Sequence, residues 1–160
     1  NAWSPMQFSN QDNVQCHRVQ TAPEIHKQVI EENQIWSAFI HGAGTGGTME
    51  GIRRYKELHN LRTKLCLVQP AESPHGIQGI ADGKDFLFNS ENADNIILIK
   101  TQDAIARAKE FARKTGLLVG ISSGANILAA ERYVDSRLLS GIVVTMLCDR
   151  GERYMSIYEE

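Results

Sequence analysis

Residues 35–48 read Ile35-Trp-Ser-Ala-Phe-Ile-His-Gly-Ala-Gly-Thr-Gly-Gly-Thr48. The run that opens this stretch is apolar and contains β-branched and aromatic side chains, which is typical of a buried strand. A helix is predicted to follow through Leu58, so the glycine-rich turn lies where a strand gives way to a helix. Glycine lets the backbone approach a ligand closely, and the N–H groups of such a turn and of the helix N-terminus point into one concavity. The stretch therefore predicts a phosphate site, in which Thr45 and Thr48 add hydroxyl donors. A tight turn without a ligand is the alternative, but it does not require four glycines and two threonines.

The kind of phosphate compound is narrowed by what surrounds this turn. A nucleotide-binding P-loop requires a lysine before its last Ser or Thr, and Gly47 stands at that position. Gly42, Gly44 and Gly47 formally match the dinucleotide pattern G-x-G-x-x-G. However, the acidic residue expected at the end of the next strand is missing, because Val68 is followed by Gln69-Pro70. A nicotinamide-dependent enzyme is therefore the weaker alternative.

Outward from the turn, short apolar runs alternate with amphipathic segments. Strands are predicted at 65–68, 96–99 and 142–147, in addition to 35–40, and a long loop region at 70–95. Helices are predicted at 23–32, 49–58, 101–114, from Gly124 to Val134, and at 152–158. Thr21 and Thr101 are expected to cap two of the helices, and Gly116 to end one of them. This alternation predicts an α/β fold with a mainly parallel sheet flanked by helices. We expect a single α/β domain at 21–160, preceded by an extended connector at 1–20.

Composition limits the classes of partner. The 160 residues carry a formal net charge of -2 with acids and bases interleaved, so neither nucleic acid nor an anionic membrane is an expected partner. No apolar run approaches the ~18–20 residues that a membrane-spanning helix needs. Cys16, Cys66 and Cys148 are scattered, so neither a disulfide framework nor a metal site is predicted. Cys66 and Cys148 are interpreted as small core residues, and a reducing, cytoplasmic setting fits best.

Five segments, in order along the chain, resemble those of one enzyme family. Gly42–Thr48 resembles the phosphate loop of cysteine synthases (O-acetylserine sulfhydrylases) and their cystathionine β-synthase relatives, the fold-type II pyridoxal-phosphate enzymes. The other similar segments are Phe8-Ser-Asn10 with Pro23-Glu-Ile25, Pro74-His-Gly-Ile-Gln-Gly-Ile80, Gly120-Ile-Ser-Ser-Gly-Ala125 and Gly151-Glu-Arg-Tyr154. The resemblance covers nearly the whole chain and implies the larger, C-terminal domain of that fold.

The resemblance also implies roles for individual residues. Pyridoxal 5'-phosphate would be the cofactor, with its phosphate held by Gly44, Thr45, Gly46, Gly47 and Thr48. Ser122 would lie opposite the pyridine nitrogen; the alternative is that Ser122 and Ser123 only cap the helix that follows. Gln78 and Gly79 would form the substrate loop, in which His75 is interpreted as loop structure. Two departures fall in this loop: the insertion that usually precedes His75 is absent, and Ala81-Asp82 replaces a Gly-Ala pair.

The family's Schiff-base lysine belongs to its N-terminal half. None of the lysines here stands in that context, so no catalytic residue is predicted in this chain and the chain alone is expected to be inactive. These lysines are Lys27, Lys56, Lys64, Lys84, Lys100, Lys109 and Lys114. The chain begins at Asn1 rather than Met and shows no signal segment, so a piece of a longer protein is expected.

The implied activity belongs to the complete enzyme. It is β-replacement on an activated serine, such as O-acetylserine with sulfide to give cysteine. The expected partners are an amino-acid substrate, the N-terminal part of the same enzyme and a second copy in a homodimer. A truncated, non-catalytic binding module is the alternative from another class.

Overall fold

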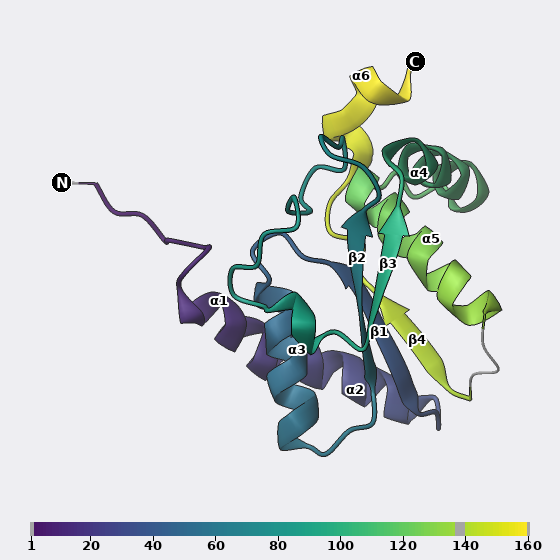
Figure 1. The fold of residues 1–160 in the computed structure, drawn as a ribbon. Helices are drawn as coiled ribbons and strands as arrows, with labels where there is room; N and C mark the ends of the chain where they lie inside the picture. The colour runs from purple at the N-terminus through teal and green to yellow at the C-terminus, as the bar shows by residue number, and fades with distance from the viewer. Residues whose placement is uncertain (1, 137–139, 160) are drawn as a thin grey trace.

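The computed structural model describes residues 2–136 and 140–159. Its centre is a sheet of four strands in the order β3-β2-β1-β4, and each neighbouring pair runs parallel (Figure 1). The strands are β1 (Trp36–Gly42), β2 (Lys64–Pro70), β3 (Asn95–Ile99) and β4 (Ile142–Thr145). The predicted α/β fold with a parallel sheet is thereby confirmed.

Helices cover both faces of this sheet. One group comprises α1 (Gln11–Cys16), the π-helix η1 (His17–Thr21), α2 (Ala22–Glu31) and α3 (Gly47–Leu58). The other side holds α4 (Thr101–Thr115) and α5 (Ile121–Asp135) (Figure 1). Short helices complete the chain: η2 (Ser90–Asn92), η3 (Gly151–Tyr154) and α6 (Met155–Tyr158). Within the described ranges, no helix is long and apolar enough to cross a membrane.

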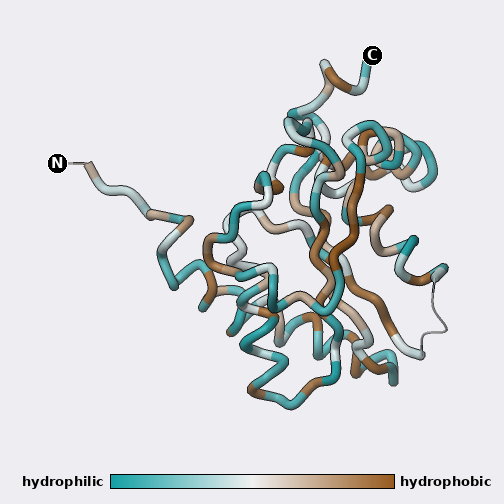
Figure 2. The backbone as a smooth tube through the Cα atoms, viewed as in Figure 1, coloured by the Kyte–Doolittle hydropathy of each residue, from teal (hydrophilic) through white to brown (hydrophobic). Residues whose placement is uncertain are grey.

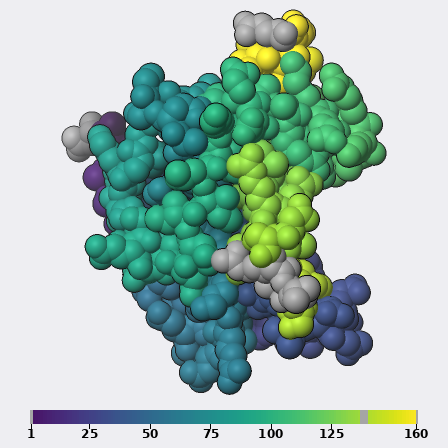
Figure 3. All heavy atoms as spheres, turned by 45° about the vertical axis from the view of Figure 1, so that its right-hand side comes forward, coloured from purple at the N-terminus to yellow at the C-terminus, as the bar shows by residue number. Residues whose placement is uncertain are grey.

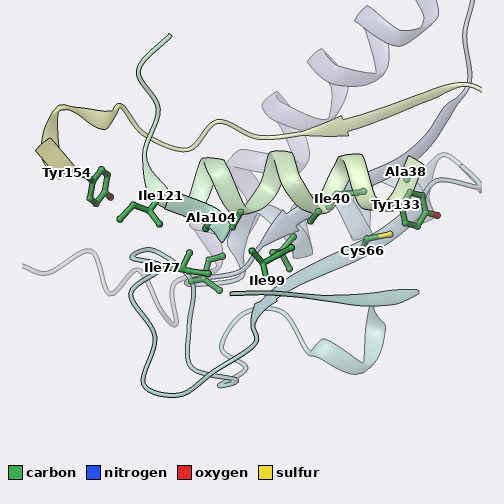
Figure 4. Packing of buried hydrophobic residues seen from close by; sticks show 13 residues of the cluster. Ala38, Ile40, Cys66, Ile77, Ile99, Ala104, Ile121, Tyr133 and Tyr154 are labelled. Carbon is green, nitrogen blue, oxygen red and sulfur yellow. The ribbon is translucent and has the colours of Figure 1, made fainter. Parts of the chain in front are cut away.

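Alternation along the strands divides the core between the two faces. Ile40 and Val68 belong to a cluster with residues of α4 and α5, whereas Phe39 and Leu67 pack with residues of α2 and α3. Successive side chains of a strand point to opposite faces, so a sheet covered on both sides needs continuous apolar runs. Figure 4 shows Ile40 and Ile99 of the strands packed beside α5, with Ile121 at the start of that helix. Figure 2 shows the strands as the most hydrophobic part of the backbone.

The prediction of an extended connector at 1–20 is wrong for its second half. Asn10 caps α1 by accepting a hydrogen bond from Asp12 N, and helical structure then continues through η1 into α2. Val14 is fully buried, and a Cβ on Gly51 of α3 would lie 2.6 Å from His17 Cβ. The segment is therefore helical because it packs against α3, which its own polar sequence does not reveal. The division of the chain at residue 20 stays a prediction.

Two predicted helix caps are also wrong, whereas the predicted end of α4 is confirmed. The Thr21 hydroxyl lies 3.0 Å from His17 Nδ1 inside continuous helix. Lys100 is the residue at the N-cap of α4, and the Thr101 hydroxyl accepts instead from Gly76 N at 2.9 Å. Gly116 ends α4 in the left-handed conformation, at φ +76°.

Candidate functional site

The glycine-rich turn joins β1 to α3 at the carboxyl end of the sheet. Gly46 precedes the helix with φ +83°, a left-handed conformation that glycine adopts without strain. The N–H groups of the first turn of α3 have no intrahelical acceptor; Gly47 N donates to Thr45 Oγ1 at 3.2 Å, and those of Thr48 and Met49 are available to an anion. This is the cradle geometry that the sequence predicts.

The protein itself requires glycine in this turn. A Cβ on Gly46 would lie 2.6 Å from Phe88 N, and one on Gly47 would overlap the side-chain amide of Asn13. The sequence suggested that glycine leaves space for a ligand. The structure adds that the segment ending at Phe88 and helix α1 press directly on the turn.

The loop that the sequence predicts to border the substrate lies directly against this turn. Ala81 N donates to Ala43 O at 2.9 Å, and Leu87 N donates to Thr45 O at 2.9 Å. A Cβ on Gly44 would overlap the carbonyl oxygen of Gly79. In the space-filling view of Figure 3, the teal and green-teal residues of the long connection that follows β2 spread over a large part of one face. The two loops predicted to hold phosphate and substrate are thus adjacent.

A cavity of about 340 Å³ opens between the two loops. Gly44, Gly79 and Lys84 contribute to its lining, and so do Phe8 and Phe86, whose ring centroids lie 4.8 Å apart. The sequence did not predict that Lys84 lines the cavity. Gln78 is exposed beside it.

His75 holds the loop in shape. Its Nδ1 accepts from Ile77 N at 3.1 Å, and its Nε2 lies 2.8 Å from Asp82 Oδ1. These contacts match the structural role predicted for His75. Asp82, one of the residues that depart from the family pattern, also has a structural contact, because its carboxylate binds His75 and so connects the two ends of the loop.

Ser122 borders the same loop from the other side. A Cβ on Gly79 would lie 3.7 Å from Ser122 Oγ, and Ser122 stands in the first turn of α5. Neither serine caps this helix, because Gly120 is at the N-cap and no side chain makes the capping bond. Ser123 Oγ instead accepts from Cys148 N at 3.0 Å. The two neighbouring serines therefore have different contacts: Ser123 Oγ is bonded to the backbone of Cys148, whereas the Ser122 hydroxyl makes a side-chain hydrogen bond with the Cys148 thiol and also lies beside Gly79 of the loop.

A buried polar cluster around Asn126 connects the glycine-rich turn to the segment after β4. The sequence did not predict this cluster. Asn126 Oδ1 accepts from Gly42 N at 2.9 Å, while its Nδ2 lies 3.1 Å from His41 Nδ1 and donates to Met146 O at 3.0 Å. Asn126 is completely buried, and burial lowers the pKa of His41 to about 4. Asn126 thus ties the start of the glycine-rich turn to the segment after β4.

Of the two cysteines predicted to be core residues, only one is buried. Cys66 is buried in the core as predicted, but Cys148 is exposed, which corrects the prediction of a core residue. Its Sγ lies 3.5 Å from Asn126 Nδ2 at the edge of the polar cluster. The apolar run ends as a strand at Thr145, so Cys148 falls in the loop that follows rather than in the sheet.

One acidic side chain sits in the first turn of α3, and it is neutralised. The Glu50 carboxylate accepts from Arg53 Nε at 2.7 Å and from Arg54 Nε at 2.6 Å. Burial alone would raise the pKa of Glu50, but the bonds from the two arginines lower it overall, so the group is an ion pair rather than an uncompensated charge. The groups left to bind an anion are the N-terminus of α3, backbone donors of the turn and the hydroxyls of Thr45 and Thr48. This donor set fits the phosphate group of pyridoxal phosphate.

Comparisons with known proteins agree with this geometry. Residues 1–149 match the family model described as pyridoxal-phosphate dependent enzyme. Cysteine synthase B of Campylobacter jejuni is 39% identical over 98% of this chain and 54% of its own length. A probable cysteine synthase of Bacillus subtilis is 37% identical over 98% of this chain and 53% of its own.

A solved structure has the same fold as this chain. A hydrogen sulfide-producing enzyme from Fusobacterium nucleatum superposes with a TM-score of 0.85 at 34% identity, covering 96% of this chain and 49% of that one. The chain thus spans about half the length of the relatives it matches. The family match decides for pyridoxal phosphate over the nicotinamide alternative. This chain belongs to the family of pyridoxal-phosphate dependent enzymes, among relatives of the cysteine synthase type.

Proposed function

We propose that this chain is the C-terminal part of a cysteine synthase-type enzyme, which catalyses β-replacement on an activated serine such as O-acetylserine. The observation that carries the proposal is the meeting of three loops: Gly44 lies against Gly79, and Gly79 lies against Ser122. These loops are far apart in sequence, and each was assigned a separate part of cofactor or substrate from its motif. Gly44 and Gly79 line one cavity, and Ser122 lies beside Gly79, which supports a single site.

Pyridoxal phosphate supplies an electron sink, which allows the β-substituent of the amino acid to leave. The residues of this chain bind and orient. Gly44 to Thr48 hold the phosphate through backbone N–H groups and hydroxyls. Ser122 offers a neutral hydroxyl to the pyridine nitrogen, which it can hydrogen-bond without forcing protonation of the ring. Gln78 and Gly79 border the substrate.

The rest of the complete enzyme is also part of the proposal. We place the lysine that binds the cofactor covalently in an N-terminal part, and we expect the complete enzyme to be a homodimer in the cytoplasm. Cys16, Cys66 and Cys148 are scattered along the sequence without the spacing of a disulfide framework, which supports a reducing compartment. A non-catalytic binding module is the alternative, because the chain spans about half of its relatives.

The product of the complete reading frame tests these proposals. We expect the reading frame to extend upstream of Asn1 into a segment with a cofactor lysine, and its purified product to form cysteine from O-acetylserine and sulfide. The 160-residue chain, assayed in parallel, should form none. A reading frame without such a segment, whose product binds pyridoxal phosphate but forms no cysteine with any activated serine offered, would favour the binding module instead.

A further inference from the structure

Residues of α1 and η1, near the start of the chain, lie directly against the glycine-rich turn and the helix that follows it. Asn13 of α1 stands over Gly47, and His17 of η1 packs on Gly51. Figure 1 shows α1 beside α3. Neither residue was assigned a role from the sequence. Both reach a threonine hydroxyl of the turn, and the direction of those hydrogen bonds follows from the chemistry of the groups.

Asn13 settles the orientation of the Thr45 hydroxyl. Asn13 Nδ2 lies 2.9 Å from Gln7 O, which can only accept, so Nδ2 is the donating nitrogen of this amide. Its second hydrogen reaches Thr45 Oγ1 at 3.0 Å, and Gly47 N donates to the same oxygen at 3.2 Å. A hydroxyl has two lone pairs and one hydrogen. With both lone pairs of Thr45 Oγ1 occupied, its hydrogen must be donated to another acceptor.

His17 can impose the same orientation on Thr48. His17 Nε2 lies 3.2 Å from Thr48 Oγ1, and His17 Nδ1 lies 3.0 Å from Thr21 Oγ1. Burial lowers the pKa of His17, so the ring is neutral at pH 7 and carries a single N–H. If Nε2 carries the hydrogen, Thr21 donates to Nδ1 and Thr48 keeps its own hydrogen free. If Nδ1 carries it, Thr48 must donate to the ring and cannot donate to a phosphate.

We propose, resting on the function proposed above, that Asn13 and His17 are positioning residues that hold the hydroxyls of Thr45 and Thr48 as hydrogen donors toward the cofactor phosphate. His17 has the Nε2–H tautomer in this arrangement, with the Thr21 hydroxyl donating to Nδ1. The phosphate oxygens are pure acceptors, so hydroxyls set in advance to donate match them without rearrangement. Helix α1 and η1 are thereby part of the cofactor site.

Comparing two ligands isolates the phosphate contact. The dissociation constants of pyridoxal 5'-phosphate and of pyridoxal, which lacks the phosphate, are measured for each variant of the 160-residue chain by fluorescence titration. We expect His17→Leu to weaken pyridoxal phosphate binding roughly tenfold, because Thr48 is no longer held as a donor and its hydrogen bond to the charged phosphate weakens, while pyridoxal binding is unchanged. His17→Gln should restore most of the loss, because the amide nitrogen of glutamine can donate to Thr48.

Asn13→Asp tests the other threonine with an isosteric side chain. The carboxylate can only accept, so it should draw the Thr45 hydrogen away from the phosphate and weaken pyridoxal phosphate binding tenfold or more. Gln20→Leu, an exposed position of η1, is the matched control and should change neither constant. If His17→Leu and Asn13→Asp lower the affinity for both ligands equally, the residues act only on the fold, and the inference is wrong.

A measurement without cofactor covers the case in which variants fail to fold. ¹⁵N NMR of the parent chain reports which His17 nitrogen carries the hydrogen; the Nε2–H tautomer is expected, and Nδ1–H would overturn the inference. The proposed function fails differently: a parent chain that binds pyridoxal phosphate no better than pyridoxal would overturn the phosphate cradle itself, whatever the tautomer. A parent that discriminates and a His17→Leu variant that discriminates equally would overturn only the inference.

Discussion

Gly44 and Gly79 are in such close contact that a Cβ on Gly44 would overlap the Gly79 carbonyl oxygen. They are 35 positions apart in the sequence (79 − 44), and their contact places the predicted phosphate loop beside the predicted substrate loop. Since both partners at this contact are backbone, neither can move without shifting its loop.

The first prediction concerns this contact. Gly44→Ala should lower the free energy of unfolding by about 1–3 kcal/mol, the usual cost of forcing an extra carbon into a packed site, and should abolish pyridoxal phosphate binding. Urea unfolding and a cofactor titration measure the two effects. Gly83→Ala is the control, because its Cβ would meet nothing within 4 Å. That variant should lose only about 1 kcal/mol for its positive φ and still bind the cofactor. Equal loss of binding in both variants would contradict this account of Gly44.

Ser122 and Ser123 should respond differently to truncation. In the complete enzyme, Ser122→Ala should retain the cofactor but slow the release of acetate from O-acetylserine roughly tenfold, through loss of about 1 kcal/mol of hydrogen bonding to the ring. Ser123→Ala should instead lower stability by about 1 kcal/mol, because Cys148 N loses its acceptor, and leave the rate unchanged.

Ser122→Asp sharpens this comparison. A carboxylate at this position favours a protonated ring, so the absorption spectrum of the bound cofactor should change as well as the rate. Stopped-flow absorbance follows both variants. If Ser122→Asp behaves like the parent while Ser123→Ala is slow, the contact to the ring nitrogen belongs to Ser123.

His41 predicts a pH dependence of stability. Burial lowers its pKa to about 4 in the folded chain, from an ordinary value of 6.5. The neutral ring is therefore favoured by folding: its contribution is complete above pH 6.5 and is lost as the pH falls toward 4. Between pH 7 and pH 5 the loss from this group is on the order of 2 kcal/mol. Urea unfolding at the two values should show a smaller loss in His41→Gln, by about that amount, because His17 and His26 titrate alike in both proteins. An identical loss in parent and variant would show that His41 is not responsible.

The lysines of this chain should not bind the cofactor covalently in a specific way. After incubation with pyridoxal phosphate and reduction with borohydride, peptide mapping should show scattered, substoichiometric labels. Lys84 is the lysine to watch, because it lines the cavity between the two loops. A single stoichiometric label, on Lys84 or elsewhere, would mean that the catalytic lysine lies in this chain.

Much of the fold was predictable because its signals are local. The apolar runs, the glycine-rich turn and the amphipathic helices are read within a few residues, and their order identifies a parallel sheet. The three loops of the site were predictable from motifs, but their contact was not.

What the sequence missed depends on long-range contacts. Residues 11–20 are helical because Asn13 and His17 bond to threonines about 30 positions away. Asn126 looks like an isolated polar residue in an apolar helix, yet its partners come from β1 and from the segment after β4. Thr101 stands where the sequence predicts a helix cap. Its hydroxyl instead accepts a hydrogen bond from Gly76 N, and only folding brings Gly76 close to it.

The central claim is that this chain holds pyridoxal phosphate between the glycine-rich turn and the first turn of α5. A crystal structure of the protein with pyridoxal phosphate tests it most directly. We expect the phosphate against Gly44 to Thr48, within hydrogen-bond distance of both threonine hydroxyls, and the pyridine nitrogen within hydrogen-bond distance of Ser122 Oγ. A cofactor bound with its phosphate away from this turn, or with its ring nitrogen facing a residue other than Ser122, would contradict the account.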